Sequence, residues 1–313
     1  MSFLRRRPAW QSGSRKKLSP FILVGGCLIV AVSVWFFVRH VDGHLLLRAL
    51  ALTRPVGLAV ACLLALAQLA CRGTVFRTLI MPVVWMPWMR AQRFMLATSA
   101  TTALVPGRAG DFVRAYLLKR DENVAVASTA AVTAVEKTVE VLAMFLVMLP
   151  VPLLLPHLPS WVGKSLVLTA VIASGLLLAI AILATRTRPP RWFASFSVGL
   201  EILRRPALLG RALLASIGSW LMDLACLLAV MHAVGVDAPA ASGLLVILAV
   251  NLAIAIPAVP GNLGTVELGA VAGLQPFGVS VELGLAVGIL YHLAQVLPIA
   301  ALALLDRVFA VEK

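Results

Sequence analysis

The chain has 313 residues, of which 61% are apolar, and its 27 Lys and Arg residues outnumber its 13 Asp and Glu residues. About half of the residues in a soluble domain are apolar, so this composition and a mean hydropathy of +0.99 exclude an ordinary soluble protein and indicate an all-α polytopic membrane protein. The basic excess lies in loops beside apolar segments, which favours membrane lipids with anionic headgroups as partners and argues against nucleic acid.

The first apolar run, 21–38, follows a basic tail at 1–19 that we expect to be cytoplasmic. The run is longer than a signal-peptide core and no small-residue cleavage pattern follows it, so we expect a retained membrane anchor. A second crossing begins near Pro55 and runs at least to Cys71; the sequence leaves open whether it continues past Arg72 toward Ile80.

A broken segment comes next. Residues 91–104 are too short and too polar to cross the membrane comfortably, and Pro106 and Gly107 then interrupt the chain. We interpret this segment as a re-entrant hairpin whose outbound arm is a helix over 112–118, because a lipid-facing break in a helix is costly.

The remaining apolar segments continue the same pattern. A basic linker at 186–211 is typical of a short helix on the membrane surface. The predicted segments are the third crossing at 125–149, the fourth at 164–184, the fifth at 212–234, a second hairpin at 243–275 that folds at 257–264, and a last crossing at 283–305. We therefore predict about six transmembrane helices and two re-entrant hairpins. With this number of crossings, the positive-inside rule places the N- and C-termini in the cytoplasm.

The two broken segments share a motif. Val105, Pro106, Gly107 and Gly110 recur as Val259, Pro260, Gly261 and Gly264, an offset of 154 residues, whereas about 0.09 chance occurrences of Pro-Gly-x-x-Gly are expected. We therefore predict two repeats, about 55–149 and 212–305, joined by a connector at 150–211, within one transmembrane domain at 20–305 that a cytoplasmic tail at 306–313 follows. An odd number of crossings separates equivalent parts, so the repeats are inverted, an arrangement that recurs in transporters.

The broken backbone is the predicted binding site. Its exposed amides must line a cavity, and the helix that starts after Asp111 or Thr265, both residues that can cap a helix, points its positive end there, which favours phosphate. We expect the substrate-binding residues to be Pro106, Gly107, Arg108, Gly110, Asp111, Arg114, Glu136, Glu140, Pro260, Gly261, Asn262, Gly264 and Glu267. A purely structural Pro-Gly turn is the alternative.

Charged groups in the membrane need partners, since an isolated charge costs from about 3 to above 10 kcal/mol. We expect Glu136 or Glu140 to face Arg108 or Arg114, although Arg114 has the alternative of reaching toward the interface. Lys137 is interpreted as a structural partner of Glu136, with contact to lipid headgroups as the alternative. We interpret the single polar groups Asp223, His232, His292 and Gln295 as packing residues. Cys27, Cys62, Cys71 and Cys226 lie in apolar segments, and we expect no metal and no cofactor.

These motifs resemble the transmembrane, flippase-like region of the lysylphosphatidylglycerol synthase family. The resemblance rests on residues 106–111 with Arg114, on Glu136, and on residues 260–264 with Glu267; Lys137 and Glu140 depart from the usual pattern. It implies a stand-alone translocating region in the bacterial inner membrane without the soluble synthase domain. A link to hopanoid or polyprenyl lipid pathways, with an enzyme of lipid biosynthesis as partner, is a further implication.

The resulting hypothesis is a translocator in which Arg108 and the two half-helix ends hold a phosphate-bearing headgroup. The sequence contains no nucleotide-binding loop, and proton coupling through Glu136, Glu140 or Glu267 stays open. The alternatives are an intramembrane enzyme that acts on a lipid phosphate, against which no catalytic pattern of His or Ser is present, and a non-catalytic partner of a lipid-modifying enzyme.

Overall fold

The computed structural model describes residues 43–104, 109–155, 160–185, 194–254, 262 and 264–311. Within these ranges the chain is helical, without strands. The elements are α2 (Gly43–Ala51), α3 (Pro55–Ile80), α4 (Trp88–Leu104), α5 (Ala109–Glu122), α6 (Val126–Met148), α7 (Val151–Leu154), α8 (Ser160–Thr185), α9 (Ala194–Gly199), η2 (Glu201–Arg204), α10 (Pro206–Val234), α11 (Ser242–Ile254), α12 (Thr265–Leu274), η4 (Gln275–Phe277) and α13 (Val281–Val311).

Five stretches of helix in the described ranges are long and apolar enough to cross a membrane: Pro55–Ile80, Val126–Leu154, Trp161–Ala179, Pro206–Val234 and Val281–Asp306. They coincide with five of the six predicted crossings, and the predicted first crossing at 21–38 lies outside the described residues. The protein is therefore an all-helical, multi-pass membrane protein. Large apolar side chains along α8, such as Leu178, are exposed, as expected for a helix that faces lipid.

The structure resolves one boundary that the sequence left open and shifts another. Helix α3 continues without a break through Arg72 to Ile80, which is the longer of the two extents considered for the second crossing. Helix α10 begins at Pro206, six residues before the predicted start, because proline at the first helical position lacks only an N–H that would have no partner there. The same helix ends at Gly235, whose φ of 83° favours glycine.

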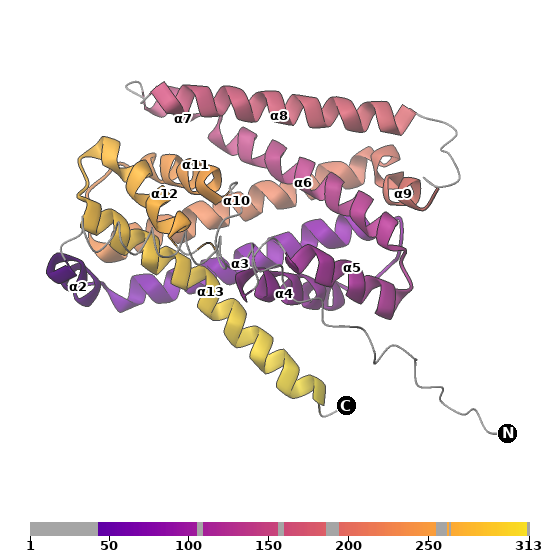
Figure 1. Ribbon diagram of the computed structural model, residues 1–313, viewed down its shortest axis with the longest axis horizontal. Coiled ribbons are helices and arrows are strands. Elements are labelled where there is room, and N and C mark those ends of the chain that lie inside the picture. The colour runs from indigo at the N-terminus through magenta and orange to yellow at the C-terminus, as the bar shows by residue number, and fades with distance from the viewer. Residues whose placement is uncertain are drawn as a thin grey trace, which may run out of the picture.

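The predicted hairpin arms are helices. Helices α4 and α5 form the first pair, and α11 and α12 form the second, while the connecting turns at 105–108 and 255–261 lie outside the described residues. In Figure 1 the α4–α5 pair lies toward the right end of the long helices and the α11–α12 pair toward the left end. The turn from α3 to α4, the turn from α5 to α6, helix α9 and the C-terminal end of α13 all lie toward the right end.

The first spans of the two predicted repeats, α3 and α10, pack along each other in opposite directions. A Cβ on Gly57, near the start of α3, would lie 2.6 Å from the Cβ of Ala233 at the end of α10. A Cβ on Gly218, in the first half of α10, would lie 3.7 Å from Sγ of Cys71. The last span of each predicted repeat packs on the first span of the other: α6 on α10, and α13 on α3.

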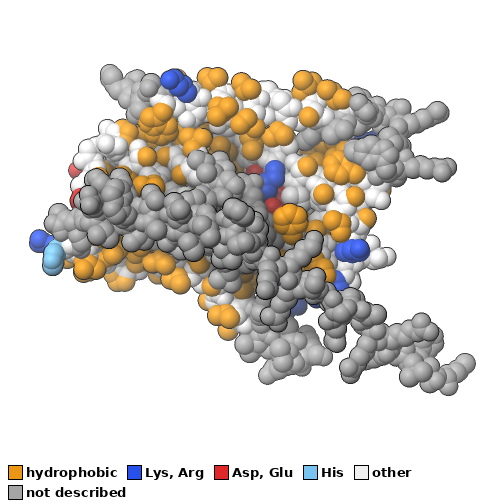
Figure 2. All heavy atoms as spheres, in the orientation of Figure 1, with side chains coloured by type: hydrophobic (Ala, Val, Ile, Leu, Met, Phe, Trp, Pro, Cys, Tyr) orange, Lys and Arg blue, Asp and Glu red, His pale blue; other side chains and the backbone are white. Residues whose placement is uncertain are grey.

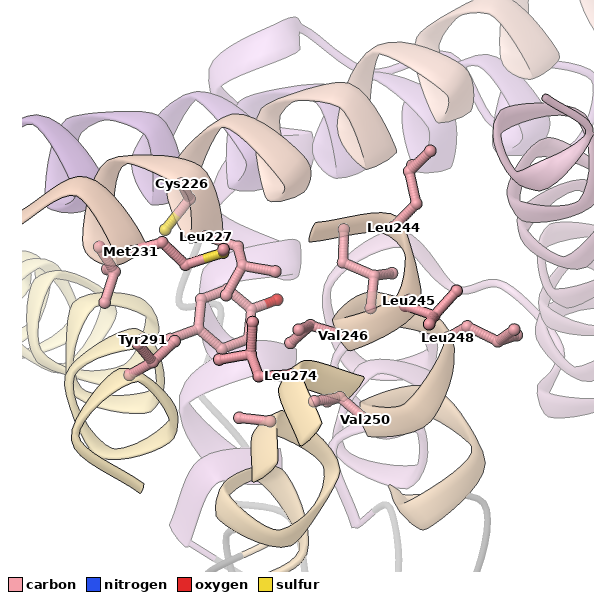
Figure 3. Close-up of a cluster of buried hydrophobic side chains, with 14 of the residues drawn as sticks. Cys226, Leu227, Met231, Leu244, Leu245, Val246, Leu248, Val250, Leu274 and Tyr291 are labelled. Carbon is pink, nitrogen blue, oxygen red and sulfur yellow. The ribbon is translucent and has the colours of Figure 1, made fainter. Parts of the chain in front are cut away.

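Two apolar clusters hold this arrangement together. One joins α10 to the second hairpin and α13, and Figure 3 shows it with Leu227, Val246, Leu274 and Tyr291 among the side chains that converge there. The other joins α3 and α4 to α6, with Phe76, Met95 and Val135 among its members. Each hairpin thus has its own core, and α3 and α10 contribute to both clusters.

Candidate functional site

A central cavity of about 340 Å³ lies where both hairpins meet the long helices. Helices α3, α4, α5, α6, α10, α11, α12 and α13 all contribute to its wall. Among its lining are charged and polar side chains that an apolar membrane core does not need for packing: Gln68, Arg72, Thr98, Thr102, Asp111, Lys137, Glu140, Ser216, Ser219, Trp220, Asp223, Asn251, Asn262, Tyr291, His292 and Gln295. Figure 2 shows basic and acidic side chains close together near the middle of one face of the molecule.

Arg114 is the centre of a buried ion cluster behind this wall. Its side chain is 1% exposed, and its Nη1 lies 2.8 Å from Oε2 of Glu136. Its Nη2 donates to Asp111 and to the Thr133 hydroxyl, each at 3.2 Å, and the guanidinium lies 4.8 Å from the centre of the Phe76 ring. The expected pairing of Glu136 with a hairpin arginine is therefore observed for Arg114. The alternative that Arg114 reaches toward the interface is wrong, because its partners hold it inside.

Glu140 lies one helical turn beyond Glu136 and forms part of the cavity wall itself. Lys137 Nζ lies 2.8 Å from Oε2 of Glu140, and Arg72 Nη2 lies 3.6 Å from Oε1. Lys137 was expected to pair with Glu136, and that interpretation is wrong, since Glu136 is already held by Arg114. The Trp220 indole N–H donates to the Glu140 carbonyl at 3.1 Å and so connects α10 to α6 beside this carboxylate.

Asp223 carries a second carboxylate into the cavity, from α10. The Tyr291 hydroxyl and the Gln295 amide each donate to its Oδ1 at 2.7 Å, and Gln68 lies within hydrogen-bonding reach. No cation lies within 4 Å of Asp223 in the part of the chain that the structure describes. Neutral donors therefore satisfy this carboxylate.

The second hairpin has a carboxylate at its inner end. Glu267 accepts the backbone N–H of Gly264 at 2.7 Å and lies 3.1 Å from Nδ1 of His292 on α13. Gly264 has a φ of 83° and Asn262 a φ of 57°, so the chain makes a left-handed turn immediately before α12. Glu267 thereby caps the helix, reduces the number of free amides at its N-terminus, and ties the hairpin to α13.

The residues that were expected to cap the outbound arms do not do so. Asp111 is the third residue of α5, and its carboxylate faces Arg114. The N-cap position of α12 is Gly264, and the Thr265 hydroxyl donates to the Asn262 carbonyl at 2.7 Å. Gly110 has a packing role, since a Cβ there would lie 2.2 Å from the Thr98 carbonyl oxygen of α4.

Some of the predicted site residues cannot be placed. Pro106, Gly107, Arg108, Pro260 and Gly261 lie outside the described residues. Of the others, Asp111, Glu140 and Asn262 line the cavity, whereas Arg114 and Glu136 form the buried cluster next to it. Among the described residues, no group of three or more His, Cys, Asp and Glu side chains is placed to hold a metal ion.

Sequence reasoning missed several residues of the cavity wall. Arg72 was given no role in the site, and Asp223, His292 and Gln295 were interpreted as packing residues, yet all four line the cavity. The signal that could have found them is that each is a polar or ionisable group inside a crossing, which by itself favours a functional site. His232, near the end of α10, does not line the cavity. Its ring lies 3.5 Å from Nη1 of Arg54.

The fold and the cavity define a multi-pass membrane protein with ionisable groups at its centre. The chain belongs to the family of the lysylphosphatidylglycerol synthase TM region, whose model matches residues 23–303. The resemblance noted in the sequence is therefore confirmed, and the protein is a lipid-related membrane protein. No curated protein matches the chain.

Proposed function

We propose that the protein translocates a phosphate-bearing membrane lipid between leaflets of the bacterial inner membrane. The observation that carries this proposal is the cavity of about 340 Å³, where charged side chains from both predicted repeats meet inside a membrane domain. A polar headgroup can cross the bilayer at low cost only where protein groups replace its water. The acyl or prenyl chains would remain in the surrounding lipid.

The packing of the long helices supports alternating access. Helices α3 and α10 run in opposite directions, and α6 and α13 each pack on the first span of the other repeat. This reciprocal arrangement fits inverted repeats, in which rocking of one half against the other opens a central site to either side. Re-entry of α4–α5 from the cytoplasmic side and of α11–α12 from the opposite side is part of the same proposal.

The test is reconstitution of the purified chain in liposomes that contain phosphatidylglycerol with a tracer in its acyl chain. External periodate cleaves the headgroup diol but does not cross the membrane, so without transport only outer-leaflet lipid reacts. We expect the wild-type protein to bring inner-leaflet lipid to the reagent and Glu267→Gln to slow this, because the substitution weakens the cap that positions α12. Lys119→Ala, on the exposed end of α5, is the control. Equal rates with wild-type and empty liposomes would refute translocation of this lipid.

The second candidate is an intramembrane enzyme that acts on a lipid phosphate. The observation that favours it is His292, which lies on the cavity wall with Nδ1 3.1 Å from Glu267, the arrangement of a base that a carboxylate orients. Mass spectrometry of the same liposomes distinguishes the two: a new lipid product that disappears in His292→Gln supports an enzyme, and movement without a product supports transport.

A further inference from the structure

We propose that Arg72 and Lys137 are the anion-binding residues of the cavity, and that a lipid phosphate binds them by displacing Glu140. This inference rests on the proposed function for the lipid nature of the ligand. Neither cation belongs to the repeated Pro-Gly motif, where the sequence predicted an anion site at Arg108 and the two half-helix ends; both lie instead on the cavity walls that α3 and α6 form.

Arg114 is not available to a ligand. Its side chain is 1% exposed, and both terminal nitrogens already contact Glu136, Asp111 and Thr133. Removing it from these partners would leave the buried carboxylate of Glu136 without a compensating cation, which is strongly unfavourable. Arg114 therefore holds the first hairpin against α6 and does not bind the headgroup.

Arg72, in contrast to Arg114, is available to a ligand. Its side chain is 41% exposed, it lines the cavity, and its contact with Glu140 is 3.6 Å, which is too long for a hydrogen bond. Lys137 also lines the cavity, is 35% exposed, and shares the same Glu140 carboxylate at 2.8 Å. Both cations thus share the Glu140 carboxylate, and the Arg72 guanidinium, which also lies near enough to Asp223 for electrostatic attraction, retains donors for a further anion.

A phosphodiester fits this pair better than Glu140 does. Arginine presents a planar fork that matches phosphate geometry, and lysine adds a mobile point charge. Phosphate oxygens between Arg72 and Lys137 would compensate both cations, and Glu140, whose side chain is 22% exposed, would then keep only Arg114 as a nearby cation among the described residues. Glu140 then keeps the two cations paired while the cavity holds no ligand.

Asp223 restricts which phosphates fit. Gln68, four residues before Arg72 on the same face of α3, reaches Asp223, so this carboxylate lies about one helical turn from the proposed phosphate position. Its charge repels a phosphomonoester that carries a second negative charge, whereas hydroxyl or amine donors at the end of a headgroup can bind it. The cavity is therefore suited to a phosphodiester whose outer end donates hydrogen bonds.

The experiment measures binding of short-chain phosphatidylglycerol to the purified full-length chain in nonionic detergent by calorimetry. We expect Arg72→Gln and Lys137→Gln each to weaken binding about tenfold or more, as for loss of a charge-assisted hydrogen bond. Glu140→Gln removes the competing anion and is expected to tighten binding severalfold, an effect that a purely structural role would not give.

The matched control Lys119→Gln, on the exposed end of α5, should bind as wild type. Size-exclusion profiles show which variants fold, and Arg72→Lys, which keeps the charge but not the fork, replaces Arg72→Gln if that variant aggregates.

The lipid series tests the same geometry. Diacylglycerol of equal chain length should bind weakly and be insensitive to all variants, and phosphatidylcholine and phosphatidic acid should bind less tightly than phosphatidylglycerol or phosphatidylethanolamine. Unchanged binding in Arg72→Gln, weaker binding in Glu140→Gln, or no phospholipid binding by wild type would each overturn the inference.

The periodate assay separates this inference from the proposed function. Binding with this variant pattern but without translocation would refute only the proposed function, and normal translocation by the Arg72→Gln/Lys137→Gln double variant would refute only the inference.

Discussion

At the residue scale, the arginine on the first outbound arm has a structural role that its position in a motif does not reveal. Arg114 is buried, and it joins α5 to α6 through Glu136 and to α3 through the face of Phe76. Three helices, the consecutive pair α5 and α6 and the earlier α3, therefore depend on one guanidinium. Removing a buried cation with this many partners destabilises a fold mainly because the partners are left buried and unpaired.

We expect Arg114→Gln to lower the free energy of unfolding by about 3–5 kcal/mol, because the Glu136 charge would remain buried without a cation. Arg114→Gln/Glu136→Gln should recover part of this loss. Arg120→Gln, an exposed arginine on the same helix, is the matched control and should change stability by less than about 1 kcal/mol. Unfolding in mixed micelles of mild detergent and dodecyl sulfate measures all three. Equal losses for Arg114→Gln and Arg120→Gln would contradict the structural role.

At the element scale, the second hairpin is held by close helix contact. A Cβ on Gly273 of α12 would lie 2.5 Å from the Cα of Val246 on α11, and a Cβ on Gly269 would lie equally close to Val250. Small residues let two helix backbones approach, and this is the main way in which helices pack within a bilayer. The spacing of four residues repeats the contact on one face of α12.

Gly273→Ala should therefore destabilise the protein by roughly 1–3 kcal/mol, since the helices must separate to accept the methyl group. Gly175→Ala offers the opposite case. A Cβ on Gly175, on the long helix α8, has no neighbour within 4 Å, so alanine there should leave stability unchanged or raise it by up to about 1 kcal/mol. Thermal midpoints in one detergent compare the pair. A loss in Gly175→Ala as large as that in Gly273→Ala would argue against the crossing as the cause.

The elements were largely predictable from the sequence, because a hydrophobic run of sufficient length has few alternatives to a helix in lipid. The arms of both hairpins were also expected, since Pro and Gly interrupt runs too short to cross. The cavity could not be predicted from the sequence, and Arg72 shows the reason. A charged residue leaves the end of a predicted span undecided when it is judged alone, and carboxylates on helices distant in sequence, Glu140 and Asp223, are what compensate Arg72 inside α3.

The same limit applies to the candidate site. The sequence pointed to Glu136 and Glu140 as residues that need cations, and both are paired, but it could not assign Arg114 to the first or Lys137 and Arg72 to the second. Side-chain pairing depends on helix rotation, which hydrophobicity does not determine within these uniformly apolar helices. Asp223 was assigned to packing for the same reason, since its donors Tyr291 and Gln295 lie on another helix. Ligand binding by these residues stays a prediction.

At the scale of the whole molecule, the two hairpins face opposite ends of the long helices (Figure 1). Lys119, near the end of α5, and Gln275, just after α12, should therefore react from opposite sides of the membrane. We expect a membrane-impermeant maleimide to label Lys119→Cys and Arg204→Cys only from the cytoplasm and Gln275→Cys only from outside, in a background without the native cysteines. All three positions are exposed. Labelling of Gln275→Cys from the cytoplasm would contradict the inverted arrangement.

The last helix, α13, has a proline in its interior. Pro298 cannot donate the usual hydrogen bond one turn back, so α13 is weakest just beyond Tyr291 and Gln295, which touch the cavity. Farther along, Asp306 lies 3.0 Å from Arg93 of α4. A helix bends most easily where a backbone hydrogen bond is missing, so a displacement of the α4 arm would bend α13 in the turn before Pro298 and shift Gln295, a donor to Asp223.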